Sequence, residues 1–379
     1  MKKLAVVTTH PIQYYAPVFQ LLAARNNIEL CVFYSGGEKG FNDFDKGFNR
    51  KISWDIPLLQ GYDHKFLLNT AKKPGSHHFF GVINPDIIQC INNFAPDAIL
   101  VYGWAWSGHL KVIDHFTNKI PVWFRGDSTL LNNTKGLKAI LKTIFLKWVY
   151  SKIEKAFFVG KNNKDYFLKY GVPERKLMFA PHAIDNERFN SDPSNGSKVR
   201  AAFKISNEAI LILFAGKLDP DKDPQLLLEA FLQAKLTDSH LLFVGNGSLE
   251  KDLKDKCRDL GVKNVYFMDF QNQSYMPEIY SACDLFCLPS RSETWGLAVN
   301  EAMAAGKAIL ASDKTGCASD LILEGKNGGI FLSGDLNDLI INLENLCHKG
   351  KLQDLGAESL KIIENWSFNE QVIAFESQL

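Results

Sequence analysis

The sequence lacks several features that would assign it to a special class of protein. None of its 379 residues belong to an uninterrupted apolar stretch near the ~18 residues that a membrane-spanning helix needs. It has no polar, low-complexity segment of the kind that stays disordered. The apolar run near the start ends at His10 and Pro11, too soon for a secretory signal, and predicts a first strand. We therefore expect a folded, soluble protein that at most lies on a membrane surface.

The sequence also lacks an excess of charge. Lysine and arginine number 43 and aspartate and glutamate 42, so no global field favours nucleic acid as a partner. The seven cysteines are scattered and odd in number, which favours reduced thiols in a cytoplasmic protein over a disulfide framework. Cys283 and Cys287 could suggest a metal pair, but no second pair with ligand spacing stands nearby, and core packing is the favoured interpretation.

What is present is a repeated alternation of short strands and helix-like segments in two halves. The chain is longer than one hydrophobic core usually serves, so two domains are expected. The alternation is typical of βαβ units with parallel strands. Strands are predicted at residues 4–8, 28–34, 98–102, 121–125 and 156–159, and again at 210–215, 240–244, 264–267, 285–289 and 308–312.

These patterns predict an α/β protein with two Rossmann-like domains that face each other across a cleft. Residues 186–197 are rich in turn formers and lack periodicity, so we place the boundary near residue 190. The predicted domains are 1–190 and 191–379, with the last helix packing back onto the first domain. Ligands of such sheets bind beyond the carboxyl ends of the strands, where candidate site residues should be sought.

Residues 290–306 contain two glutamates separated by seven residues. The pattern predicts a helix from Gly296 to a cap at Gly306, with Glu293 in the loop before it and Glu301 inside it. A helix N-terminus can bind a diphosphate, and a glycine there allows close approach. The two carboxylates could then bind sugar hydroxyls and ribose hydroxyls respectively. The alternative is that they only stabilise the helix.

This segment resembles the donor motif of family 4 glycosyltransferases, which have the GT-B fold and retain the anomeric configuration. The loop after residues 210–215 is similar to that family's Gly-Arg-Leu loop, with Gly216 first, Lys217 at the arginine position and Lys222 five residues on. The resemblance implies that both lysines grip the donor diphosphate, although lysine lacks the bidentate fork of arginine. Two solvated loop lysines are the alternative.

Further motifs follow in the family's order, and the resemblance is strong over residues 208–332. It implies a glycine-rich turn at Gly245 beneath the nucleotide and base binding by Asp269 and Phe270, where an aromatic could also be core. The remaining donor-binding positions that it implies are Thr294, Trp295, Gly296, Leu297 and Glu301.

The N-terminal half resembles the family less, and its candidates rest on their places after strands. His10, Gln13 and Tyr14 follow the first strand and suit sugar recognition, or cap and fill the loop. Asp127 follows a later strand and could contact the donor sugar or the acceptor, or cap a helix. Trp104 belongs to an aromatic cluster that forms an acceptor platform or core.

Residues 135–155 hold six lysines and one glutamate in an amphipathic helical pattern. Such a helix could dock on anionic lipid, which would fit a lipid-linked acceptor. We favour a solvated lysine face on a helix whose apolar side is in the core. The apolar set is Leu137, Ile140, Leu141, Ile144, Phe145, Trp148 and Val149.

Together the resemblance implies a retaining hexosyltransferase without a cofactor, and the two lysines would make a divalent metal redundant. It would take a UDP- or GDP-sugar as co-substrate and glycosylate a glycan or lipid-linked glycan in cell-surface polysaccharide synthesis, in the cytoplasm or at the inner face of the membrane. Lys217, Lys222, Glu293 and Asp127 would be its catalytic residues. The alternatives are an epimerase or phosphorylase of the same shape and a non-catalytic nucleotide-sugar-binding subunit.

Overall fold

A computed structural model of the chain describes all residues except 39–43, 46–49, 52, 132–135 and 191–192. It divides into two compact units. The N-terminal unit comprises residues 1–43, 52–182 and 368–379, and the C-terminal unit comprises residues 44–51 and 183–367. The change of unit at Ala183 precedes the expected boundary, because Asn186–Phe189 forms helix α6 and buries Phe189 against Tyr280 of the C-terminal unit, with ring centroids 5.6 Å apart.

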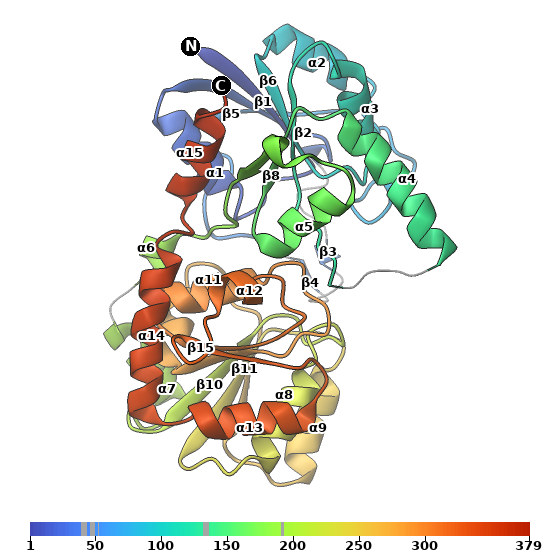
Figure 1. The fold of residues 1–379 in the computed structure, drawn as a ribbon. Coiled ribbons are helices and arrows are strands. Elements are labelled where there is room, and N and C mark those ends of the chain that lie inside the picture. Colours follow the sequence, from blue (N-terminus) through green and yellow to red (C-terminus); the bar gives the residue numbers. More distant parts are fainter. Residues whose placement is uncertain (39–43, 46–49, 52, 132–135, 191–192) are drawn as a thin grey trace. The chain divides into compact units, whose positions relative to one another are not determined.

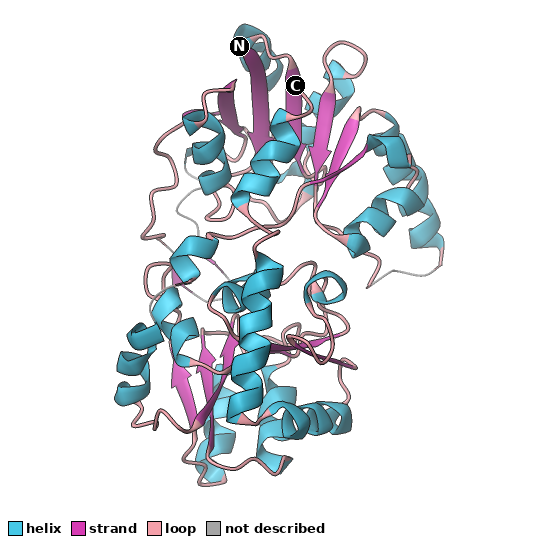
Figure 2. Ribbon diagram, turned by 60° about the vertical axis from the view of Figure 1, so that its left-hand side comes forward, coloured by secondary structure: helices cyan, strands magenta, loops and turns pink. Residues whose placement is uncertain are grey.

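The N-terminal unit is built on a parallel seven-stranded sheet in the order β5-β2-β1-β6-β7-β8-β9, with helices on both faces (Figures 1 and 2). Its strands are β1 (Lys2–Thr8), β2 (Ile28–Tyr34), β5 (Asp63–Phe66), β6 (Ala98–Tyr102), β7 (Val122–Arg125), β8 (Lys155–Phe158) and β9 (Leu177–Phe179). Its helices are α1 (Ala16–Ala24), α2 (Ile87–Phe94), α3 (Ser107–Phe116), α4 (Leu137–Ser151), α5 (Lys161–Lys169) and α15 (Phe368–Glu376).

Both faces of this sheet are buried, as expected for a parallel sheet covered by helices. Along β6, Ile99 and Val101 face one core, and Leu100 and Tyr102 face the other. Helix α15 contributes Phe375 to the second core, so the end of the chain folds with the N-terminal unit.

The C-terminal unit is built on a parallel six-stranded sheet in the order β12-β11-β10-β13-β14-β15. Its strands are β10 (Ile210–Ala215), β11 (Ser239–Val244), β12 (Val265–Met268), β13 (Leu285–Leu288), β14 (Ala308–Ser312) and β15 (Gly328–Phe331). Its helices are α6, α7 (Gly196–Ala202), α8 (Pro224–Gln233), α9 (Glu250–Asp259), α10 (Met276–Ala282), α11 (Leu297–Ala304), α12 (Ala318–Leu321), α13 (Leu336–Leu346) and α14 (Lys349–Ile363). A short antiparallel pair, β3 (Phe44–Asp45) and β4 (Arg50–Lys51), is grouped with this unit.

The strand order reverses direction once in each sheet, between β1 and β6 and between β10 and β13. Loops at such a switch point diverge to opposite faces and leave a crevice at the carboxyl edge of the sheet. In the C-terminal unit these are the loops that begin at Gly216 and Pro289, which carry the predicted donor residues. In the N-terminal unit they begin at Thr9 and Gly103.

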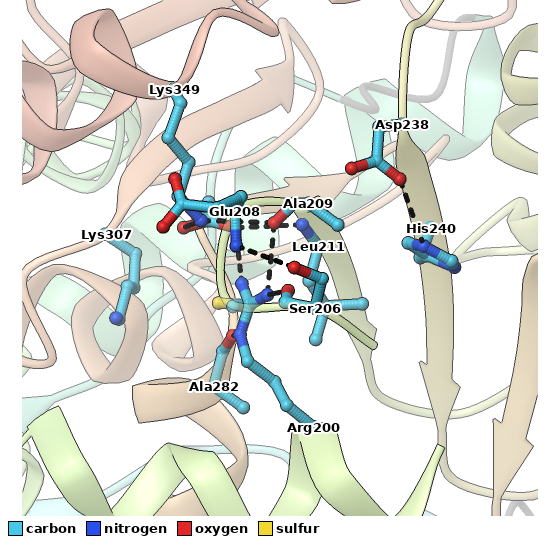
Figure 3. Close-up of polar contacts among 12 residues, drawn as sticks. Arg200, Ser206, Glu208, Ala209, Leu211, Asp238, His240, Ala282, Lys307 and Lys349 are labelled. Carbon is cyan, nitrogen blue, oxygen red and sulfur yellow. Dashed lines mark hydrogen bonds and ion pairs between the residues drawn. The ribbon is translucent and has the colours of Figure 1, made fainter. Parts of the chain in front are cut away.

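At the amino-terminal ends of β10 and β13, away from the candidate site, a buried ionic cluster joins the two strands (Figure 3). The guanidinium of Arg200 donates to the carbonyls of Ala282 and Ala209 at 2.8 and 3.0 Å and to Asp284 Oδ2 at 2.6 Å. Lys349, at the start of α14, donates to the same Asp284 carboxylate at 2.8 Å. The cluster ties α7 and α14 to the two strands whose pairing forms the switch point.

All ten predicted strands are present, with ends shifted by at most two residues. The interpretation of residues 135–155 as a core helix is confirmed through Leu146, Val149 and Tyr150, but most of the predicted apolar side does not face the core. Helix α4 forms, but Leu137, Ile140, Leu141, Ile144 and Trp148 are exposed, because the helix packs on the sheet through a different side. Lys135 lies outside the described residues. Cys283 and Cys287 are buried in the core, as expected.

Candidate functional site

The loops that follow β10 and β13 meet at the switch point of the C-terminal unit. Lys222 Nζ, in the first loop, forms an ion pair with Glu293 Oε2 in the second. Both side chains are mostly buried, with exposed fractions of 21% and 16%. The structure therefore brings together two of the predicted catalytic residues, which stand 71 positions apart in the chain.

Backbone and side-chain bonds fix the position of this ion pair. The Asp219 carboxylate accepts the Lys222 N–H at 3.0 Å, which closes a tight turn in the β10 loop. The Asp221 carbonyl accepts the Arg291 N–H at 2.8 Å, and Arg291 Nε donates to Asp223 Oδ2 at 2.7 Å. Sequence reasoning missed Arg291 and Asp223, because their pairing depends on the contact between two loops.

Helix α11 begins where the donor motif predicted. Gly296 is its N-cap with φ of +98°, a left-handed conformation that favours glycine, and Gly306 follows its end with φ of +70°. Glu293 precedes the helix and Glu301 is its fifth residue, as predicted. The amides of the first turn have no helical acceptors of their own and can bind an anion.

Glu301, about one turn into α11, has only 4% of its surface exposed. Its Oε2 accepts a hydrogen bond from the hydroxyl of Tyr280 at 2.8 Å, from the neighbouring helix α10. Trp295 is also buried, and its indole N–H donates to Asn300 Oδ1 at 2.9 Å. The Trp295 indole is thus part of the core, so donor contact at this position would come from the backbone rather than from the ring. Thr294 is exposed and Leu297 half-buried on either side of the cap.

The loops after β11 and β12 belong to the same edge of the sheet. A Cβ atom on Gly245 would lie 2.0 Å from the Gly216 carbonyl oxygen, so the turn after β11 needs glycine to contact the turn after β10. The side chain of Asn246 accepts the Phe270 N–H at 2.8 Å and donates to Asp269 Oδ1 at 3.2 Å. Asn246 thereby links the predicted base-binding residues to the glycine-rich turn. Sequence reasoning named the turn but not this amide.

In the N-terminal unit a pocket of about 200 Å³ follows β6 and β7. Asp127 and Trp104 both line it, so these two predicted residues are brought together. Its other walls include Tyr150 of α4 and Trp106. Trp104 packs against Phe145 of α4 with ring centroids 5.4 Å apart, and the pocket lining combines several aromatic side chains with the Asp127 carboxylate.

His10, Gln13 and Tyr14 do not line this pocket; they lie half-buried in the loop between β1 and α1. His10 Nδ1 is 2.9 Å from the hydroxyl of Thr9. Tyr15, next in the chain, contacts Tyr102 with ring centroids 4.7 Å apart. The structure thus separates the predicted acceptor residues into two groups on neighbouring loops of one sheet edge.

Burial is the main cause of the pKa shifts of the titratable side chains beside these loops. Burial raises the pKa of the Tyr15 hydroxyl, and the nearby Asp127 carboxylate raises it further. Arg125 is buried and donates to the carbonyls of Ala180 and Pro181 at 2.8 and 3.0 Å. Burial, helped by the Arg125 charge, lowers the pKa of His182 to about 3. His182 is therefore neutral at physiological pH.

In the parts of the chain that the structure places, no three histidine, cysteine or acidic side chains are grouped to hold a metal ion. Within the same parts, no helix is long and apolar enough to cross a bilayer.

Residues 197–359 match the model of the family Glycosyl transferases group 1. The chain is 28% identical over 227 residues to a lipopolysaccharide 1,2-N-acetylglucosaminetransferase of Salmonella typhimurium, covering 56% of this chain and 58% of the relative. It is 26% identical over 190 residues to a GDP-mannose-dependent α-(1-6)-phosphatidylinositol monomannoside mannosyltransferase of Mycolicibacterium smegmatis, covering 48% and 49%. The chain thus matches about half the length of these curated relatives.

The similarity to solved structures extends over the whole chain. Anabaena Alr3699/HepE, solved in complex with UDP and glucose, superposes with a TM-score of 0.72 at 18% identity and full coverage of both chains. Sucrose-phosphate synthase from Thermosynechococcus elongatus superposes with a TM-score of 0.74 at 15% identity, covering 100% of this chain and 98% of the other. At these identities the likeness shows the fold alone. The chain therefore has the GT-B fold, and residues 197–359 of its C-terminal unit match the glycosyl transferases group 1 family.

Proposed function

We propose that this protein is a retaining glycosyltransferase that moves a hexosyl unit from a UDP- or GDP-sugar to a hydroxyl of a glycan or lipid-linked glycan. The observation that carries the proposal is the Lys222–Glu293 ion pair beside the N-terminus of α11, at the switch point of the C-terminal sheet. This arrangement offers cations and helix amides to a diphosphate and a carboxylate to the hydroxyls of a sugar.

The proposed chemistry depends on stabilising the leaving group. As the bond between the anomeric carbon and the diphosphate oxygen breaks, negative charge grows on the diphosphate. Lys217, Lys222 and the amides that follow Gly296 would stabilise this charge in a partly buried environment, where electrostatic interactions are stronger than in water. The acceptor hydroxyl attacks the same face, and its proton passes to the departing diphosphate. Retention rests on the family resemblance.

Besides binding a sugar hydroxyl, Glu293 would respond to nucleotide binding, because it forms an ion pair with Lys222. A diphosphate that binds Lys222 competes with Glu293 for the ammonium group and releases one carboxylate oxygen to a sugar hydroxyl. Binding of the nucleotide and orientation of the sugar are then coupled through one ion pair. Glu301, buried about one turn into α11 and hydrogen-bonded to Tyr280, would take the ribose hydroxyls.

We assign the acceptor to the N-terminal unit, and its aromatic pocket with Asp127 is the site that suits a sugar. The names of the relatives, a lipopolysaccharide N-acetylglucosaminetransferase and a phosphatidylinositol mannoside mannosyltransferase, support an acceptor in cell-surface polysaccharide or glycolipid synthesis. Seven free cysteines, five of them buried, support a cytoplasmic location, where thiols stay reduced.

The experiment that tests this proposal is nucleoside diphosphate release. The protein is incubated with UDP- and GDP-sugars, with and without glycan or glycolipid fractions, and the anomeric configuration of the product is read by NMR. We expect release that depends on both substrates and a product of retained configuration. Tight binding without release would instead identify a non-catalytic binding subunit, and inverted configuration would contradict the proposed stereochemistry.

We further propose that transfer needs no divalent metal, because Lys217, Lys222 and the α11 terminus supply the charge that a metal would otherwise bring. Activity should persist in excess EDTA. A rate that vanishes with the chelator and returns with magnesium or manganese would contradict this assignment.

A further inference from the structure

Helix α4, at the periphery of the N-terminal unit (Figure 1), has two apolar faces rather than one. Its inner face is buried in the core through Leu146, Val149 and Tyr150. An outer stripe of apolar side chains lies on the opposite side, because its members recur in steps of 3, 1, 3 and 4 residues and so align along one side of a helix. The outer stripe consists of Leu137, Ile140, Leu141, Ile144 and Trp148, with exposed fractions between 46% and 76%.

The described residues of the N-terminal unit leave this outer stripe exposed. A helix packed on a sheet needs one apolar side, and its solvent side is normally polar. Among the described residues, five of the sixteen large apolar side chains that are exposed belong to this one helix. Such a concentration of exposed apolar surface marks an interaction site rather than ordinary surface variation.

The charges around the outer stripe indicate what it binds. No acidic residue occurs between Leu137 and Lys152, whereas lysines stand on both flanks of the stripe. Lys138 is exposed on one flank and Lys147 on the other. Trp148, whose indole suits the boundary between lipid and water, has the ammonium of Lys152 4.7 Å from its ring centroid. An apolar stripe between flanking lysines is the pattern of a helix that lies in the surface of an anionic bilayer.

We propose that α4 docks the N-terminal unit onto a bilayer that contains anionic lipid. The outer stripe enters the boundary between headgroups and acyl chains, and Lys138 and Lys147 contact lipid phosphates. The helix lies along the surface and does not span the bilayer, since its 15 residues are fewer than the ~20 that spanning requires.

The inner face of the same helix connects this surface to the candidate acceptor pocket. Tyr150 lines the pocket that contains Asp127, and Phe145 packs on Trp104 of its wall. A docked α4 holds this pocket about one helix diameter, ~10 Å, from the lipid. This step rests on the proposed function and narrows its acceptor to a lipid-linked glycan.

Vesicle sedimentation tests the docking without any catalytic readout. Vesicles of phosphatidylcholine mixed with phosphatidylglycerol are compared with vesicles of phosphatidylcholine alone. We expect the intact protein to bind the mixed vesicles, and Ile140→Gln/Ile144→Gln to reduce partitioning at least tenfold. Ile341→Gln/Ile373→Gln, which changes two exposed isoleucines on α13 and α15, is the matched control and should bind as the unmodified protein does.

The charge contribution is measured separately with Lys138→Gln/Lys147→Gln. We expect a loss of roughly fivefold per lysine on the mixed vesicles and a similar loss when salt is raised. Circular dichroism and calorimetric binding of UDP and GDP check that each variant is folded. Equal vesicle binding by the unmodified protein and the isoleucine variant, or no binding by either, would overturn the proposal. So would a dimer in analytical ultracentrifugation that the same isoleucine variant dissociates, because a second copy would then cover the outer stripe.

Transfer assays distinguish this inference from the proposed function. With acceptor lipid in vesicles, Ile140→Gln/Ile144→Gln should lower the rate at least tenfold, while transfer to a water-soluble acceptor glycan stays unchanged. Vesicle binding without transfer to any acceptor would leave the docking intact and contradict the proposed function. Equal losses on both acceptors would contradict the link between α4 and a lipid-linked acceptor.

Discussion

The two units share one architecture but hold their loops in place by different means. In the C-terminal unit, backbone lies directly on backbone: a Cβ on Gly245 would lie 2.0 Å from the Gly216 oxygen, and one on Gly316 would lie 1.8 Å from the Thr294 oxygen. In the N-terminal unit, a Cβ on Gly36 would likewise lie 2.6 Å from the Thr9 oxygen, but large side chains hold the loops near the acceptor candidates. Buried Arg125 binds two carbonyls there, and Tyr15 contacts Tyr102.

This difference explains why one unit was easier to interpret from sequence. A loop that needs glycine at fixed positions, with charged residues at fixed offsets, leaves a local pattern in the chain. A loop supported by buried side chains from several strands leaves a scattered pattern, because many combinations of large residues can fill a cavity. The donor motifs therefore predicted specific residues, and the acceptor candidates were only placed after strands.

The largest expected effect is on turnover, and it tests whether the C-terminal unit binds the donor and the N-terminal unit the acceptor. Lys222→Ala should lower turnover about 100-fold or more, the scale of losing one charge that stabilises the transition state, and should also weaken nucleotide binding. Asp127→Asn should lower transfer while leaving nucleotide affinity unchanged, since Asp127 belongs to the other unit. Steady-state rates and calorimetric titration with UDP or GDP measure both quantities.

Lys251→Ala is the matched control for this pair, because Lys251 is exposed and forms an ion pair with Asp255 on α9. It should leave both quantities unchanged. A normal rate in Lys222→Ala would remove the diphosphate assignment, and a loss of nucleotide affinity in Asp127→Asn would contradict the division of labour between the units.

Matched glycine substitutions test the comparison itself. Gly245→Ala places a Cβ against backbone at a φ of +130°, so it should destabilise the protein by about 2 to 3 kcal/mol. Gly126→Ala, in the Asp127 loop, meets only the edge of the Phe124 ring at 3.2 Å and should cost under about 1 kcal/mol. Urea unfolding at equilibrium gives both values. Equal costs would show that the loops of the two units are not held differently.

The sequence predicted most of the sheets and the donor helix, but not the contacts between loops. Three strands of the parallel sheets were missed because their sequences are atypical of strands: β9 has three residues, β15 begins with two glycines, and β5 is mostly polar. The Lys222–Glu293 pair and the amide of Asn246 depend on residues brought together by the strand order, which composition does not reveal. The orientation of α4 was misjudged because its sequence has apolar residues on both faces, and amphipathicity alone does not say which face meets the core.

The paired glutamates provide the next smaller effect. Glu301→Gln should weaken nucleotide binding on the order of tenfold to a hundredfold, since a charged hydrogen bond contributes roughly 1.5 to 3 kcal/mol. Glu293→Gln removes the charge that competes for Lys222, so nucleotide affinity should hold or rise while transfer falls. If both carboxylates only stabilised the helix, calorimetry would show unchanged affinity and normal turnover in both variants.

The smallest expected effect is a fall in the unfolding free energy as the pH is lowered from 7 to 6. We expect the buried histidines of the N-terminal unit to cause most of it. Burial lowers the pKa of His109 to about 4 and, with the Arg125 charge, that of His182 to about 3. The contacts of His109 favour the neutral tautomer with the proton on Nδ1. Its Nδ1 donates to the Tyr102 carbonyl at 3.0 Å, and its Nε2 is 2.8 Å from the Ser35 hydroxyl. In the unfolded chain both histidines regain a pKa near 6.5.

The sign of the effect follows from which state binds the proton. Between pH 6.5 and about 4 the unfolded chain binds protons that the folded chain does not, so the unfolding free energy falls as pH falls through this window, and the slope fades out within about one pH unit above it. From pH 7 to pH 6 the loss should be about 0.7 kcal/mol per histidine. Urea unfolding at these two pH values measures it, and His109→Gln should remove about 0.7 kcal/mol of this loss whatever its effect on stability at pH 7. An unchanged slope in His109→Gln would mean that His109 is already protonated in the fold, and that burial in the N-terminal unit does not set its charge.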